Sequence, residues 1–262
     1  MDGDEVIFPS GYEVLPRALA EGLDVRLGTA VTAVTRSATG VRVDAENESF
    51  DAAQVVVTVP LGVLKAGTIE FTPALPDAVA EPITRLGMGV FNKVFLQFPE
   101  RFWQSDVYAI RQHGRAGVPW HSWYDVSVVS GEPMLLTFAG GDWGRQIERM
   151  SDEDVVSSAL GSLRRIYGGS VPDPVAHWIT RWGADPLALG SYSYVAVGSS
   201  HADHDAMAGP VDGVLHFAGE ATCGHEPATV HGALYSGHRA AERVLGSPVS
   251  LAELTRGVSP ST

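Results

Sequence analysis

The chain has 262 residues, of which 45% are hydrophobic, so it can bury a core as one large domain or as two modest ones. Its formal net charge of −13 argues against nucleic acids and anionic membrane surfaces as partners. The single cysteine, Cys223, excludes an internal disulfide framework, and no apolar run reaches the roughly 18 residues that a membrane span needs.

The first five residues are acidic and are followed by no apolar stretch, which excludes a signal peptide. The single cysteine fits a reducing compartment. We therefore expect a cytoplasmic protein with no membrane contact.

In the first ninety residues, the pattern predicts one short helix and several strands. The helix is expected over residues 11–22, with Gly22 ending it. Strands are predicted over residues 24–27, 31–36, 41–44 and 54–59. The last of these is apolar almost throughout, as in a strand covered on both faces. Three prolines between residues 72 and 82 predict a loop with at most a short helix.

Beyond residue 90, strands and helices mix without a regular alternation. Strands are predicted over residues 91–98 and 133–139, and residues 177–181 are expected to be extended. A helix should begin at Ser151 and end before Gly168, and a last helix is expected over residues 229–245. The region 111–130 is rich in aromatic residues and has no clear period. This order predicts an α+β fold rather than a plain Rossmann protein.

One connection near the C-terminus, between an apolar run and a helix, has residues typical of a ligand site. The apolar run 214–218 ends in Gly219 and Glu220, and a helix begins about ten residues later on small side chains. Glycine allows close approach of a ligand, a carboxylate accepts from hydroxyl groups, and helix N-terminal amides favour negative charge. The small residues are equally consistent with close packing of that helix, so both interpretations stay open on the pattern alone.

Lys93 is the most specific single candidate for a functional side chain. The period of two along residues 91–98 places it on the same strand face as Phe91 and Phe95. Either its ammonium group reaches solvent along the aromatic rings, or it is held at a site where it positions a water or acts as a base.

The loop 181–194 carries Trp182, Tyr192 and Tyr194 among glycine and proline residues. Such aromatic faces suit an amine cation or a flat ring system, or they anchor an irregular part of the core. The histidines show no metal-ligand spacing, and His201 and His204 are expected in a solvated loop. No Gly-x-Ser-x-Gly and no Gly-x-Gly-x-x-Gly occurs, so acyl transfer and a pyrophosphate-binding loop are not indicated.

Taken in order, these segments resemble the C-terminal half of the flavin-containing amine oxidases, which include monoamine oxidases, polyamine oxidases and lysine-specific histone demethylases. The most specific segments are Gly-Ser-Tyr-Ser-Tyr at 190–194, Phe-Ala-Gly-Glu at 217–220 and Pro-Ala-Thr-Val-His-Gly-Ala at 227–233. Further matching segments are residues 11–12, 19–25, 59–65, 87–93 and 181–186. The residues of these segments are most similar to those of the demethylase and polyamine oxidase branches.

The resemblance implies a role for each matching residue near a flavin ring. Lys93 matches the lysine that holds a water near the reactive N5 atom. Trp182 matches an aromatic residue packed at the flavin, and Tyr192 matches one wall of the amine-binding cage. Thr229 and Val230 match the helix start that faces the pyrimidine side of the ring, where the helix dipole would favour negative charge.

Other matches concern the rest of the cofactor. Glu220, after Gly219, matches the carboxylate that binds the ribityl chain. The backbone at Val31 matches a contact with the adenine, and Pro60 and Leu61 match a strand end that passes near the cofactor. The resemblance thus implies FAD as the cofactor and no metal.

Three residues depart from the pattern of the relatives. Ser191 stands where monoamine oxidases carry the cysteine bonded to the flavin, which implies a noncovalent FAD. Thr229 stands where they have the second cage tyrosine, which implies a one-sided cage. Leu187 replaces a tryptophan of the demethylase branch.

The implied protein is the C-terminal part of a two-lobed FAD-dependent amine oxidase. It would remove a hydride from the carbon next to an amine nitrogen, giving an imine and, after reoxidation by dioxygen, hydrogen peroxide. Residues 1–89 and 202–248 would belong to the FAD-binding lobe, residues 90–201 would form the substrate lobe, and residues 249–262 would form a tail.

A part that bears the Gly-rich Rossmann loop is expected as an N-terminal half or a partner subunit. Two alternatives remain: a non-catalytic interaction subunit, and an amino-acid oxidase that uses Arg111, Arg115 or Arg145 for the substrate carboxylate. The net negative charge of the chain mildly favours a cationic amine as the substrate.

Overall fold

The structure is a computed structural model that describes residues 8, 10–114 and 119–250. The acidic start, Arg115 and the tail beyond residue 250 lie outside the described residues. The chain divides into two compact units, Met1–Met88 with Tyr192–Thr262 (unit 1) and Gly89–Ser191 (unit 2). Mixed helices and strands in both units confirm the expected α+β class.

The second boundary between the units differs from the expected one at residue 201. Strand β12 (Ser193–Tyr194) pairs with β6 (Gly87–Met88), and Ser193 also contacts Glu220. These bonds agree with the division of the chain, in which residues 192–201 belong to unit 1, whereas the resemblance implied that they belong to the substrate lobe. The expected roles of the two units stay predictions.

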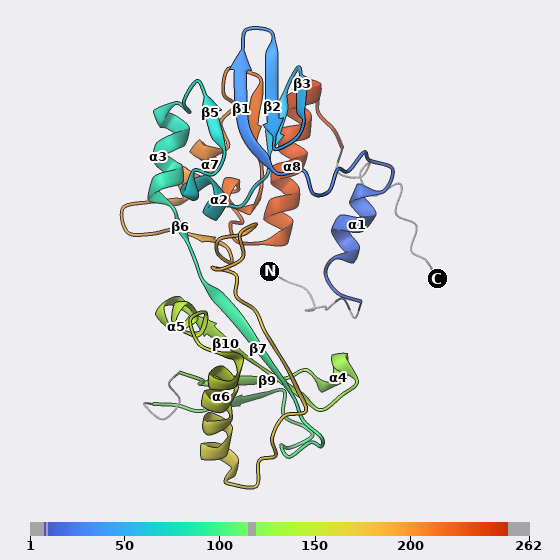
Figure 1. Ribbon diagram of the computed structural model, residues 1–262, viewed down its shortest axis with the longest axis vertical. Helices are drawn as coiled ribbons and strands as arrows, with labels where there is room; N and C mark the ends of the chain where they lie inside the picture. Colours follow the sequence, from blue (N-terminus) through green and yellow to red (C-terminus); the bar gives the residue numbers. More distant parts are fainter. Residues whose placement is uncertain (1–7, 9, 115–118, 251–262) are drawn as a thin grey trace. The chain divides into compact units, whose positions relative to one another are not determined.

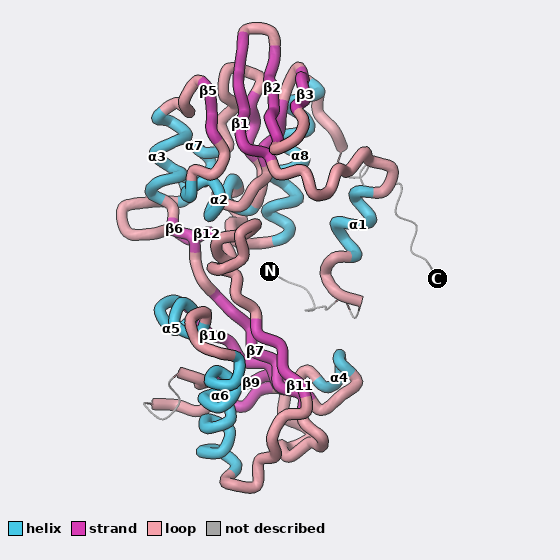
Figure 2. Tube along the Cα trace, in the orientation of Figure 1, coloured by secondary structure: helices cyan, strands magenta, loops and turns pink. Residues whose placement is uncertain are grey.

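Unit 1 distributes its strands over three small sheets (Figure 2). The largest has the order β3-β2-β1-β5, with β1 Val31–Ser37, β2 Gly40–Ala45, β3 Ser49–Ala52 and β5 Glu70–Thr72. Strand β1 is antiparallel to β2 and parallel to β5. A separate parallel pair joins β4 (Val55–Val57) to β13 (Leu215–Phe217).

The helices of unit 1, except for the first, bury residues in or beside a core that includes Val34, Leu61, Ile83, Leu215 and Phe217. They are α1 Val14–Ala20, α2 Leu61–Ala66, α3 Asp77–Arg85, α7 His201–Met207 and α8 Val230–Leu245, with a short 3₁₀ turn η2 at Glu220–Thr222. Helix α1 buries none of its residues.

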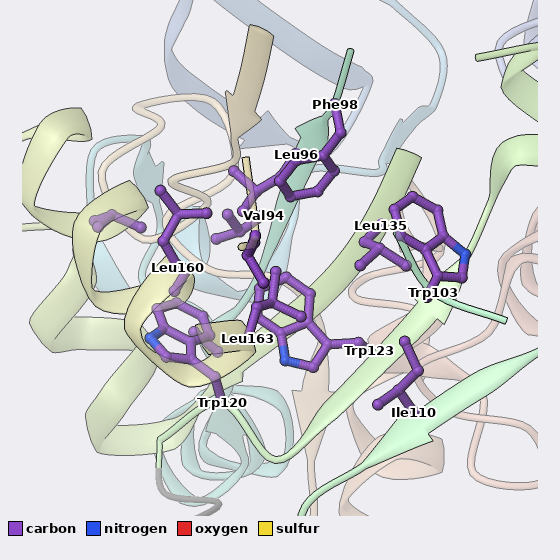
Figure 3. Packing of buried hydrophobic residues seen from close by; sticks show 14 of the residues in the cluster. Val94, Leu96, Phe98, Trp103, Ile110, Trp120, Trp123, Leu135, Leu160 and Leu163 are labelled. Atoms are coloured by element: carbon purple, nitrogen blue, oxygen red, sulfur yellow. The ribbon is translucent and has the colours of Figure 1, made fainter. Parts of the chain in front are cut away.

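Unit 2 is one antiparallel sheet with helices on one face (Figure 1). Its strand order is β11-β7-β10-β9-β8, with β7 Phe91–Gln97, β8 Ala109–Arg111, β9 Ser122–Asp125, β10 Met134–Gly140 and β11 Ala176–Ile179. The helices are α4 Ser127–Ser130, α5 Gly141–Ile147 and α6 Asp152–Tyr167. Leu160 and Leu163 of α6 pack with Val94, Trp120 and Trp123 in a dense core (Figure 3).

Four expectations about local structure were wrong. Residues 24–27 form no strand, and Leu27 is 88% exposed. The strand predicted over 54–59 is shorter and is not covered on both faces, since Val56 is exposed. Helix α3 includes Pro82, because Val79 and Ile83 bury a continuous apolar face that offsets the loss of one N–H donor.

His201 and His204 lie in helix α7, not in a solvated loop. The side chain and the N–H of Ser200 form a reciprocal capping box with Asp203, which fixes the helix start. His204 is fully buried, and its Nδ1 lies 2.9 Å from the carbonyl oxygen of Ala221. It is therefore a core histidine.

Candidate functional site

Glu220 stands at the end of β13 and joins three segments of unit 1. Its Oε1 accepts the Ser193 N–H at 2.9 Å, and its Oε2 accepts the Ser193 hydroxyl at 2.6 Å and the Ala228 N–H at 2.7 Å. Gly219 before it has a φ of +121°, which favours glycine. A carboxylate offers about four acceptor positions. One position is therefore left on Glu220 for a ligand hydroxyl.

The start of helix α8 is capped by Thr229. Its Oγ1 accepts the Gly232 N–H at 3.0 Å and donates to the carbonyl oxygen of Glu226 at 2.7 Å. Within the described part of the chain, no hydrogen bond is recorded for the N–H groups of Val230 and His231. These two amides and the dipole of a 16-residue helix therefore favour a negatively charged ligand atom.

Tyr192 directly precedes Ser193, whose N–H and hydroxyl both donate to the Glu220 carboxylate. Its neighbour Ser193 is buried against Glu220, so the strand alternation directs Tyr192 and Tyr194 to the opposite side. The Tyr192 ring is 37% exposed, and partial burial raises the pKa of its phenol. The ring of Tyr194 lies against Gly87, where a side chain would collide with it.

The remaining cofactor candidates of unit 1 are spread over its sheets. Val31 begins β1 and pairs with Ala45. Pro60 is exposed at the start of α2, whereas the side chain of Leu61 is 1% exposed and belongs to the core. Leu61 can therefore reach a ligand only through its backbone.

Lys93 and Trp182 are brought together in unit 2 by the fully buried Asn92. The Asn92 Oδ1 accepts the Trp182 N–H at 2.9 Å, and its Nδ2 donates to Glu148 Oε1 at 2.7 Å. Thr180 accepts the Lys93 N–H at 2.7 Å through its hydroxyl. The strand that carries Lys93 and the loop that carries Trp182 are thus fixed to each other.

The Lys93 side chain projects from the half-exposed face of β7. Burial alternates along the strand, with Asn92, Val94 and Leu96 buried and Lys93 exposed. Its cross-strand neighbour is Phe138 of β10. The predicted face of Lys93 is thereby confirmed.

The positioning residues Asn92, Thr180, Glu148 and Ser193 were missed by the sequence reasoning. Asn92 did carry a signal, because it occupies a strand position whose alternate neighbours, Val94 and Leu96, are apolar and buried. A polar residue at such a position needs hydrogen-bond partners. Glu148 and Thr180 gave no comparable signal, since only the fold brings them to Asn92.

Metal chemistry has no support in the described ranges. Residues 8, 10–114 and 119–250 contain no group of three or more histidine, cysteine or acidic side chains suited to a metal ion. Over the same ranges, no helix is both long and apolar enough to cross a bilayer.

The fold and these residues describe a two-unit α+β protein with a candidate polar ligand site at a Gly-Glu turn. A sequence model of the family described as flavin containing amine oxidoreductase matches residues 1–245. The chain belongs to this family of flavin-dependent oxidoreductases, as the motifs predicted.

Relatives and solved structures agree with this assignment. The chain is 43% identical over 252 residues to Lysine-specific histone demethylase 1 homolog 1 of Arabidopsis thaliana, covering 94% of this chain and 30% of the relative. It is 39% identical to Polyamine oxidase 2 of the same plant, and the match covers 92% of this chain and 49% of the relative. A putrescine oxidase structure bound to putrescine has the same fold, with a TM-score of 0.77 at 23% identity over 90% of this chain and 53% of that chain.

The chain thus spans between about a third and half of the length of these proteins. Their activities belong to the longer proteins.

Proposed function

We propose that the chain is the C-terminal part of an FAD-dependent amine oxidase. The observation that carries the proposal is the buried Asn92, which fixes the strand of Lys93 to the loop of Trp182. Structural packing alone does not require an exposed lysine and a 40% exposed tryptophan at this point. A non-catalytic subunit would have no evident need for the pair.

The residues of unit 1 fit FAD. Glu220 keeps one acceptor position for a ribityl hydroxyl, and the amides of Val230 and His231 suit the electron-rich pyrimidine side of the ring. Ser191 supports noncovalent binding, since it offers no thiol. Its hydroxyl donates to the Phe91 carbonyl at 3.1 Å and accepts the Phe91 N–H at 2.7 Å.

When bound, FAD supplies a two-electron oxidation that takes a hydride from the carbon next to the amine nitrogen; the imine is then hydrolysed, and dioxygen is reduced to hydrogen peroxide. In this proposal Lys93 holds a water molecule at the reacting end. Trp182, Tyr192 and Thr229 are assigned to amine binding by their match to the residues of the family. Asn92 keeps Lys93 and Trp182 at a fixed spacing.

We further propose that a Rossmann-type part, in the same polypeptide or in a partner chain, holds the pyrophosphate. The sequence contains no Gly-x-Gly-x-x-Gly to do so. The parallel pair of β4 and β13 also supports this, because parallel sheets are rarely stable with two strands. Additional strands beside this pair would complete a doubly wound sheet.

The test is the rate of flavin reduction by an amine, measured anaerobically by stopped flow in the protein assembled with its Rossmann-bearing part. We expect Lys93→Met to slow reduction by about tenfold or more while the flavin band near about 450 nm is retained. Gln97→Met, on the same face of β7, is the matched control and should leave the rate unchanged. An unaltered rate in Lys93→Met would remove Lys93 from the mechanism, and absence of any flavin band from the wild-type assembly would refute the oxidase function.

A further inference from the structure

Unit 2 contains a double cavity on the half-exposed face of its sheet. One cavity of about 410 Å³ has walls that include Phe91, Tyr124, Phe138 and Trp143. A second cavity of about 480 Å³ is lined in part by Arg111. The two cavities share three lining residues, His121, Ser122 and Tyr124. They therefore form one continuous depression.

The cavity extends from Phe138, the cross-strand neighbour of Lys93, to Arg111, along one row of the sheet. Lys93 pairs with Phe138, and Ser122 pairs with Arg111. The register between β10 and β9, in which Thr137 is opposite Trp123, continues to place Phe138 opposite Ser122. Four strands are thus crossed in three steps of about 4.8 Å, which separates the two ends of the row by about 14 Å.

All four side chains of this row point to the same face. Their neighbours Asn92, Trp123 and Ile110 are buried on the other face, and side chains alternate along each strand. The cavity therefore runs from the cross-strand neighbour of Lys93, at the proposed reacting end, to an arginine.

The walls of the first cavity are aromatic. The rings of Phe91 and Phe138 stack with centroids 5.0 Å apart, and Tyr124 meets Phe138 edge to face at 5.6 Å. Such walls fit an apolar or aromatic spacer. Trp143 contributes a further aromatic wall of this cavity.

The far end of the cavity is polar and carries positive charge. Arg111 makes no ion pair and no side-chain hydrogen bond with any residue that the structure describes. The described lining of both cavities contains no aspartate or glutamate and includes His113 and His121. A second ammonium group of a polyamine would therefore find no counter-charge here, whereas a carboxylate would meet a guanidinium group.

We propose that this double cavity binds the far end of the substrate and that Arg111 recognises a carboxylate there. The preferred substrates are then amines whose carboxylate lies at the other end of an apolar or aromatic spacer. Ordinary α-amino acids do not fit, because their amine and carboxylate are too close to span the row. This inference rests on the proposed amine oxidase function, and it adds a carboxylate to the cationic amine that the acidic composition mildly favours.

The test compares three ligands of equal chain length, aminooctanoate, diaminooctane and octylamine, by titration calorimetry with the chain and with its flavin-loaded assembly. We expect aminooctanoate to bind about tenfold more tightly than diaminooctane, and Arg111→Gln to abolish this preference. Arg111→Lys should keep part of it because the charge is retained. Arg145→Gln is the control, since Arg145 is exposed and paired with Asp142, and it should bind like the wild type.

A wild type that prefers diaminooctane, or a preference for aminooctanoate that survives in Arg111→Gln, would overturn the inference. Arg111 is exposed, so the variant should fold, and its thermal unfolding midpoint verifies this. Binding is measured without turnover. Arg111-dependent binding with no flavin reduction would therefore refute the oxidase function while supporting the carboxylate site.

Discussion

The two units of this protein reach stability by different means. Unit 2 has one five-stranded sheet, and Trp120, Trp123 and Leu163 are fully buried under its helical layer. Unit 1 divides its strands over three small sheets, and α1 buries none of its residues. The residues proposed to bind the cofactor lie mostly in unit 1. The comparison teaches that, under the proposed function, the unit with the denser core would carry the substrate cavity and the unit with the divided sheets would carry most of the cofactor residues.

The largest expected effect tests the core of unit 2. Leu163→Ala should cost about 2–5 kcal/mol of unfolding free energy, because it opens a cavity among fully buried side chains. All six tryptophans lie between residues 103 and 182, so tryptophan fluorescence in urea follows unit 2 alone. Val128→Ala in unit 2 is the control and should cost less than about 0.5 kcal/mol of unfolding free energy, since Val128 is exposed. Equal losses would contradict the comparison.

The next effect concerns the link between Lys93 and Trp182. Asn92→Leu should destabilise unit 2 by about 1–3 kcal/mol, because the Trp182 N–H and the Glu148 carboxylate lose their buried partner. It should also shift the fluorescence of the native state, since the Trp182 loop is released. Gln97→Leu changes the opposite face of β7 and serves as the control. A stable variant with an unchanged spectrum would show that Asn92 does not position the loop.

A smaller effect is expected at Glu220 in unit 1. Glu220→Gln should lower the unfolding free energy by about 1–2 kcal/mol. One of the three groups that donate to the carboxylate would then face an amide NH₂ group. In the assembled protein, FAD should dissociate more readily from this variant, as followed by the flavin absorbance after dilution. Glu226→Gln, on the same loop, keeps the backbone carbonyl that Thr229 uses and is the matched control. Unchanged FAD retention in Glu220→Gln would remove Glu220 from the cofactor site.

The smallest effect is acid sensitivity in both units. Hydrogen bonds from Arg85 hold the pKa of Asp203 in unit 1 below its ordinary value, and those from Arg181 do the same for the pKa of Asp152 in unit 2. A depressed pKa means that the stabilisation is complete above the ordinary value of about 3.9 and is lost as the pH falls through the lowered one.

Urea midpoints measured at about pH 6 and about pH 3 should therefore fall on acidification. Circular dichroism follows the whole chain, and tryptophan fluorescence follows unit 2. Asp152→Asn should reduce the acid-induced loss in the fluorescence signal, whereas Asp203→Asn should leave that signal unaffected. A fluorescence signal that changes in Asp203→Asn but not in Asp152→Asn would contradict the separation of the two units.

The sequence predicted those features that depend on local pattern. The alternation along residues 91–98 placed Lys93 on the correct strand face, and Ser151 caps α6 through a bond from the Asp154 N–H as expected. Helix α3 continues past Pro82, further than the short helix allowed between residues 72 and 82, because tertiary burial of Val79 and Ile83 overrides the signal of Pro82.

The predictions that failed depended on contacts between distant segments. His204 was expected in solvent because its spacing from His201 says nothing about the carbonyl of Ala221, which accepts its hydrogen bond. Likewise, no local pattern shows that Glu220 accepts from Ser193, 27 residues earlier. Its carboxylate was recognised as a candidate ligand group, but its part in holding unit 1 together was not.

The hydroxyl of Thr229 limits how the amine-binding region can be redesigned or can evolve. It already bonds to the Gly232 N–H and to the Glu226 carbonyl, so it forms the cap of α8. A tyrosine at this position, as in a two-sided aromatic cage, would remove the cap at a cost of about 1 kcal/mol. A second aromatic wall would therefore have to come together with a new way of starting the helix, and a single substitution cannot supply both.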